Sequence, residues 1–152
     1  MKSLIARELV EFLREHFQLD WHGIHGVSHW ARVRRNGLTI AASNGANITV
    51  VEYFAFLHDV CRENDGFDPD HGPRAAALAE SITGGLIQIH DNELELLKIA
   101  CEGHSDGHIE EDITVQTCWD ADRLDLPRVG IAPDPSRLCT EAARNVLMQS
   151  LL

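Results

Sequence analysis

The stretch NITVVEYFAFLHD, residues 47–59, is the most apolar part of the chain, and it ends in an adjacent histidine and aspartate. Its β-branched residues would suit a strand, but its length and its lack of apolar–polar alternation favour a helix. His58 and Asp59, at the end of such a helix, are expected to lose part of their contact with water. Burying an imidazole or a carboxylate is unfavourable unless it is paired or coordinated. The stretch therefore predicts a core helix with a polar site at its end.

The apolar spacing on both sides of this stretch is helical almost throughout. Capping residues and turn signals divide the chain into further predicted helices. These are a first helix capped by Ser3, a helix over 28–43, one that Asn47 or Thr49 opens, one over 71–82 capped by Asp70, one capped by Asp91, one over 112–124 and a last one capped by Thr140. Without a convincing strand, this order predicts an all-α fold, a compact single-domain bundle of about six to seven helices over residues 1–152.

Length, composition and charge favour a cytoplasmic protein. No apolar run approaches the roughly 20 residues of a membrane span, and Met1 to Leu13 carry charges in place of a secretory signal's apolar core. The four cysteines form no CxxC pair and are expected in the core. The net charge of −11 argues against long nucleic acid and membrane surfaces as partners. A small phosphorylated substrate remains compatible with it, and a bundle of this size often forms a homodimer.

The chain contains two His-Asp dipeptides, and their surroundings distinguish them. His90 and Asp91 stand at a predicted helix start, where the aspartate has a capping role. His58 and Asp59 follow the most apolar helix, where desolvation makes coordination of an ion favourable. We therefore expect the pair at 58–59 to bind metal and the pair at 90–91 to have no metal role.

Three motifs resemble those of the HD superfamily. The run HGVSHWARV, residues 25–33, resembles its first motif; FLHDV, residues 56–60, resembles the doublet that names it; and WDADRLD, residues 119–125, resembles its final motif. The resemblance covers most of the chain, in the order the superfamily has. It implies a helical bundle and a divalent metal held by His29, His58, Asp59 and Asp122. Asp120 is then expected to act as an acceptor behind the ligands or as a helix-start residue.

Two imidazoles and two carboxylates would neutralise a dication and leave positions open for water and substrate. This mixed donor set suits Mn, Fe, Ni, Zn, Co or Mg and names none of them. Some HD proteins carry further histidines between the doublet and the final aspartate. On that resemblance His71 and His104 are expected near the active site, either as catalytic groups or as ligands of a second metal. One metal site is expected rather than two.

The residues after the doublet depart from the named subclasses of the superfamily. Where hydrolases of guanosine polyphosphates carry two acids, this chain has Arg62 and Glu63, which argues against that activity. Glu63, or Asp65, is a candidate general base. Arg62, Arg32 and Arg74 are candidates for binding phosphate. Of the remaining histidines, His22 and His25 are candidates to line the cleft, whereas His16 and His108 are expected at the surface.

The resemblance is nearest to small HD proteins for which a phosphohydrolase activity is predicted. The first hypothesis is therefore a metal-dependent phosphohydrolase acting on a small phosphorylated metabolite or nucleotide. The second is a di-iron oxygenase, because the six side chains that such HD proteins use can be matched here, in the order His29, His58, Asp59, His71, His104, Asp122. The third is a non-catalytic metal or ligand sensor that acts through a partner.

Overall fold

The computed structural model describes residues 3–152, and within them it is helical, without a β-strand. The α-helices are α1 Arg7–His16, α2 Val27–Asn44, α3 Ile48–Leu57, α4 His71–Ile82, α5 Asp91–Gly103, α6 Ile113–Arg123 and α7 Glu141–Ser150. Two short 3₁₀ helices, η1 Leu126–Val129 and η2 Pro135–Arg137, follow α6. The predicted all-α fold is confirmed.

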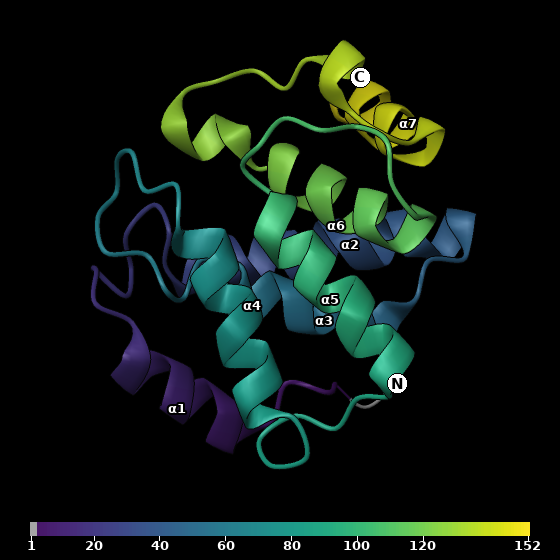
Figure 1. Cartoon of the computed structure of the whole chain (residues 1–152). Coiled ribbons are helices and arrows are strands. Elements are labelled where there is room, and N and C mark those ends of the chain that lie inside the picture. The colour runs from purple at the N-terminus through teal and green to yellow at the C-terminus, as the bar shows by residue number, and fades with distance from the viewer. Residues whose placement is uncertain (1–2) are drawn as a thin grey trace.

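Helix α3 lies at the centre of the bundle, behind α4 and α5 in the view of Figure 1. Every residue from Val50 to Leu57 is buried, because α2, α5 and α6 all pack against it. Helix α7 packs against α2 and α6, on the side of the bundle opposite α1 (Figure 1). The end of the central helix, where the His-Asp doublet follows, is therefore surrounded by other elements.

Helix starts follow capping side chains at three places, of which those of α3 and α7 were predicted as caps. The Asn47 side chain accepts hydrogen bonds from the N–H groups of Thr49 and Val50, which opens α3. The carboxylate of Asp112 opens α6, and the hydroxyl of Thr140 opens α7. Each satisfies backbone donors that the first turn of a helix leaves free.

Of three other predicted caps, Ser3 and Asp91 are wrong, and Asp70 is right in position only. Helix α1 begins at Arg7, and Ser3 lies before it, with its hydroxyl near the buried carboxylate of Glu52. Asp91 is the first helical residue of α5, and the cap position belongs to His90. Asp70 does stand at the cap position of α4, but its side chain makes no capping hydrogen bond.

Glycines allow two close helix contacts that position the site. A methyl group at Gly37 of α2 would overlap the side chain of Val51 in α3. A methyl group at Gly72 of α4 would overlap the carbonyl oxygen of Cys101 in α5. Because these backbones approach so closely, the start of α4 and the end of α5 lie together.

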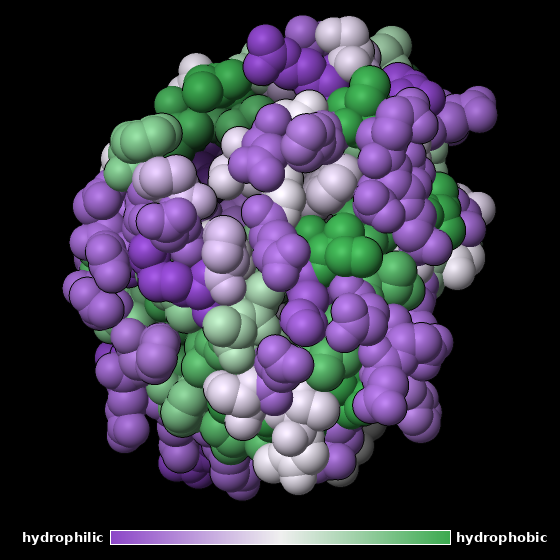
Figure 2. Space-filling view, in the orientation of Figure 1, coloured by the Kyte–Doolittle hydropathy of each residue, from purple (hydrophilic) through white to green (hydrophobic). Residues whose placement is uncertain are grey.

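The remaining features of the fold concern its surface and its cysteines. Polar residues cover most of the face in Figure 2, and apolar residues gather at the upper left, over the segment after α6, where Val129 and Ile131 are exposed. None of the helices within residues 3–152 combines the length and the apolar content that crossing a membrane requires.

Cys61, Cys101 and Cys118 are buried as expected, and burial raises the pKa of each thiol.

Candidate metal centre

Four side chains predicted as metal ligands converge at the end of α3. His29 comes from the start of α2, His58 and Asp59 follow α3, and Asp122 comes from the last turn of α6. The Nε2 atoms of His29 and His58 lie 3.0 Å apart. Asp59 Oδ2 is 3.4 Å from His29 Nε2 and 3.3 Å from His58 Nε2, and Asp122 Oδ1 is 3.2 Å and 3.6 Å from the same two atoms. One small region thus receives four donor atoms from three helices.

These separations match those of ligands around a common ion. Bonds of roughly 2.0–2.2 Å to nitrogen and oxygen place neighbouring ligand atoms about 3.0 Å apart at a right angle and about 3.4 Å apart at the tetrahedral angle. The distances between donor atoms in the cluster, from 3.0 to 3.6 Å, cover this range. His29, His58 and Asp59 are fully or almost fully buried, and Asp122 is partly exposed. The exposed side of Asp122 leaves the cluster open to a ligand.

The tautomers of the histidines also favour a cation. His29 Nδ1 lies 2.7 Å from Asp125 Oδ2, and His58 Nδ1 lies 3.1 Å and 3.0 Å from two carbonyl oxygens of α3. Because only acceptors face these Nδ1 atoms, Nδ1 carries the hydrogen in each ring, and Nε2 of the neutral ring presents a lone pair. Two such lone pairs 3.0 Å apart, next to two carboxylates, require a positive charge among them.

Without a metal, protons would supply that charge. Burial lowers the pKa of His29, but the carboxylates of Asp122, Asp125 and Asp59 outweigh it and raise that pKa to about 9. Burial also opposes the charged form of His58, and the carboxylates of Asp59 and Asp122 raise its pKa to about 10. The imidazoles in turn hold the pKa values of Asp59 and Asp122 well below the usual range, against the effect of burial. The cluster is strongly selective for positive charge.

A further carboxylate orients His29 from behind. Asp125 accepts a hydrogen bond from Nδ1 of His29 and a second one, of 2.7 Å, from Nε of Arg32. Carboxylates in this position fix the ring of a metal-binding histidine and increase its basicity. Asp120 was predicted either for that role or as a helix-start residue, and the first alternative is corrected: its carboxylate accepts hydrogen bonds from Cys139 N and from the N–H and hydroxyl of Thr140. Asp120 therefore anchors the start of α7.

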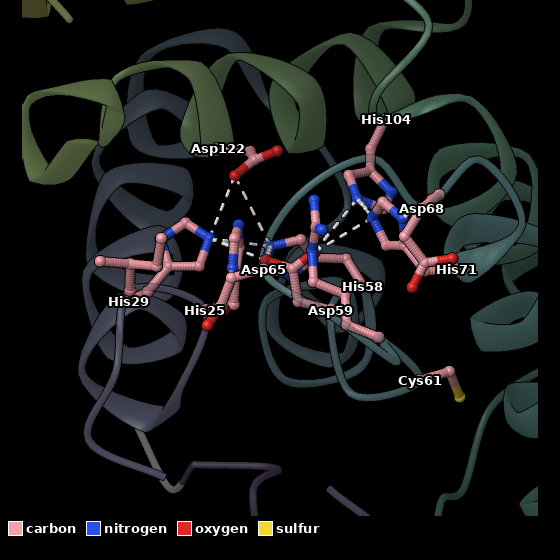
Figure 3. Close-up of polar contacts among 12 residues, drawn as sticks. His25, His29, His58, Asp59, Cys61, Asp65, Asp68, His71, His104 and Asp122 are labelled. Carbon is pink, nitrogen blue, oxygen red and sulfur yellow. Dashed lines mark hydrogen bonds and ion pairs between the residues drawn. The ribbon is translucent and has the colours of Figure 1, made fainter. Parts of the chain in front are cut away.

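A second group of donors shares Asp59. Its other oxygen, Oδ1, is 3.3 Å from His71 Nε2 and 3.4 Å from His104 Nε2, and these two nitrogens lie 2.8 Å apart. The Nδ1 atoms of both rings face the carbonyl oxygens of Asp68 and Cys101. Figure 3 shows His58 and Asp59 between His29 and Asp122 on one side and His71 and His104 on the other. Both groups, His29–His58–Asp59 and Asp59–His71–His104, could hold a metal ion.

A pocket of about 340 Å³ opens onto both groups and is lined by Asp59, His104 and Asp122. Three arginines line it as well, namely Arg62, Arg123 and Arg128. Of the arginines predicted to bind phosphate, only Arg62 is among them. Arg128 and Arg123 were missed, and the final motif offered the only signal, since both lie within or just after it.

The other predicted phosphate and acid-base residues are not brought to this pocket. Arg74 binds the Asp68 carboxylate and the Cys61 carbonyl, and together with the exposed Glu63 it lines a separate depression. The expectation that Glu63 acts as general base is therefore not retained, nor is the phosphate role of Arg74. Arg32 lies behind His29 on Asp125, which gives it an orienting contact in place of a substrate contact.

Among the remaining histidines, His25 is buried and lines the pocket, and its Nδ1 lies 2.7 Å from Oδ1 of Asp65, which lines the pocket as well. Burial lowers the pKa of His25, although Asp65 opposes this effect. His22, His90 and His108 are exposed, and none of them lines the pocket.

Comparisons with protein-family models, with curated proteins and with solved structures found no match.

Proposed function

We propose that this chain is a metal-dependent phosphohydrolase that acts on a small phosphorylated metabolite or nucleotide. The observation that carries the proposal is the convergence of His29, His58, Asp59 and Asp122, with all four donor atoms within 3.6 Å of an imidazole nitrogen, beneath a pocket lined by arginines. The resemblance of three motifs to the HD superfamily leads to the same proposal.

The four ligands would hold a divalent metal, which supplies a Lewis acid for a phosphoryl oxygen and acidifies the water that it binds. The arginines of the pocket wall would bind the phosphate. Arg62 and Arg128 each use Nε and Nη1 to contact oxygens of the protein. Within residues 3–152, Nη2 of either arginine has no hydrogen-bond partner, so it can donate to an anion. A phosphate dianion would thereby be neutralised in a chain of net charge −11.

We assign the proton transfer to His25, a buried histidine that lines the pocket. Asp65 accepts the Nδ1 hydrogen bond, so the neutral ring presents the lone pair of Nε2. Because burial lowers the pKa of His25, the ring is neutral near pH 7 and can take a proton from water. It thus replaces Glu63 as the proposed general base.

A panel of phosphate esters, tested with Mn, Mg, Ni, Co and Fe, checks this proposal. We expect hydrolysis of at least one small ester, dependent on added metal and lost after chelation. Activity that survives chelation, or inactivity across a broad panel in protein with stoichiometric metal, would contradict it. Inactivity with stoichiometric metal would instead favour a non-catalytic sensor.

The Asp59–His71–His104 group supports a second candidate function, oxygenase chemistry at a di-iron centre. Two irons would then share the Asp59 carboxylate. The metal content after growth with iron, together with oxygen consumption, separates the two functions. For the oxygenase we expect two irons per chain, falling to one in His71→Ala and in His104→Ala. For the mononuclear hydrolase, both variants should keep their metal and lose turnover.

A further inference from the structure

Arg62 contacts the oxygen that a second metal ion would use. Its Nε lies 3.2 Å from Asp59 Oδ1, the atom that also lies 3.3 Å from His71 Nε2 and 3.4 Å from His104 Nε2. The guanidinium group is thus the third neighbour of this oxygen, beside the two imidazoles. No other arginine of residues 3–152 contacts the Asp59 carboxylate.

The guanidinium group is held in this position by its own loop. Nη1 of Arg62 donates to the carbonyl oxygens of Asn64 and Gly66, at 3.3 Å and 3.2 Å. Only 12% of the side chain is exposed, so water screens its charge weakly. An arginine stays protonated at any physiological pH. The loop after the doublet therefore presents a permanent positive charge to the Asp59–His71–His104 group.

From this geometry we infer that Arg62 sets the number of metal ions that the chain holds. The inference rests on the metal centre proposed above. The hydrogen bond from Nε withdraws electron density from Asp59 Oδ1, and the guanidinium charge repels a dication bound to the same oxygen. A metal ion held by His29, His58 and Asp59 would use Oδ2 of Asp59, and it would lie farther from the Arg62 contact. Arg62 thus keeps the wild-type centre mononuclear.

A Mn²⁺ titration of chelator-stripped protein, with free Mn²⁺ counted by electron paramagnetic resonance, tests the inference. We expect the wild type to bind one Mn²⁺ tightly and a second one at least tenfold more weakly. In Arg62→Gln the second ion should bind at least tenfold more tightly than it does to the wild type. Arg128→Gln is the matched control, since it removes the same charge from the same pocket wall without touching Asp59. Its second-site affinity should stay at the wild-type value.

Two results would overturn the inference. The first is a wild type that binds two ions with equal affinity, and this measurement does not depend on the folding of any variant. The second is a folded Arg62→Gln protein whose second-site affinity is unchanged. Wild-type protein that binds no Mn²⁺, or that binds it equally well after Asp59→Ala, would refute the metal centre itself, and the inference with it.

Discussion

Asp125 shows how much of the site depends on a residue that is not itself a ligand. It fixes Nδ1 of His29 from behind, at 2.7 Å, and it also pairs with Arg32. We predict that Asp125→Ala lowers metal affinity by about ten- to hundredfold, because the His29 ring loses its orientation and part of its basicity. Metal titration measures this effect, and circular dichroism should show the wild-type helix content. Asp91→Ala, at an exposed helix start, is the control. An unchanged affinity in Asp125→Ala would contradict the prediction.

The role of His25 in proton transfer can be tested by a single substitution. We predict that His25→Ala keeps stoichiometric metal and lowers turnover of an identified substrate by about a hundredfold, since a positioned acid–base group contributes about that much. His22→Ala is the matched control, because His22 lies three residues earlier, is exposed and does not line the pocket. Equal turnover in the two variants would show that His25 has no part in proton transfer.

The sequence predicts the side chains that form the cluster but not the residues around them, for a physical reason. His58 and Asp59 follow the most apolar helix, and that desolvation can be read from the sequence. Asp120 and Asp125 stand two residues before and three after Asp122, and nothing local says which of them faces His29. The chain leaves the helix at Arg123, so the position of Asp125 depends on the turn that follows. Arg74 was misplaced similarly, because its partner Asp68 lies in an irregular loop.

At the scale of helices, the contact between the start of α4 and the end of α5 holds His71 beside His104. We predict that Gly72→Ala destabilises the protein by about 1–3 kcal/mol, because the added methyl group overlaps the Cys101 carbonyl and the two backbones must separate. Urea denaturation measures the change. Gly66→Ala is the control, since a methyl group there meets only the Asn64 side chain at an ordinary contact distance. Equal stability of the two variants would contradict this account of the helix contact.

Helix positions were predicted well where an apolar face agrees with the glycine turn signal at the end of the helix. The helix predicted over 28–43 is observed at Val27–Asn44, and the one over 71–82 is observed with those bounds. The first helix was placed too early because Ser3 looks like a cap, whereas its hydroxyl faces Glu52, a residue 49 positions away. A contact over that separation leaves no local signal.

For the whole molecule, the cluster links stability to pH and metal. In metal-free protein the folded-state pKa values of His29 and His58 are raised from 6.5 to about 9 and about 10. The stabilisation from these protonated rings is fully present below pH 6.5 and is lost as the pH rises through those values. We predict that the free energy of unfolding of metal-free protein falls by at least about 1 kcal/mol between pH 7 and pH 9.5.

Bound metal should reverse this pH dependence of the free energy of unfolding, because the metal binds the deprotonated imidazoles and releases their protons. Urea denaturation at several pH values, with and without chelator, measures both trends. Stabilisation by added metal should therefore grow as the pH rises from 7 to 9.5. A metal-free protein that becomes more stable over this range would show that His29 and His58 do not carry protons in the cluster.

The His-Asp doublet at the end of α3 is proposed to bind metal, and the metal content per chain of three proteins tests this. Wild type and His90→Ala should each retain about one metal ion per chain, because His90 belongs to the exposed His-Asp pair. Asp59→Ala should retain none, since Asp59 supplies an oxygen to each group of ligands. Stoichiometric metal in folded Asp59→Ala, or its loss in folded His90→Ala, would contradict the account.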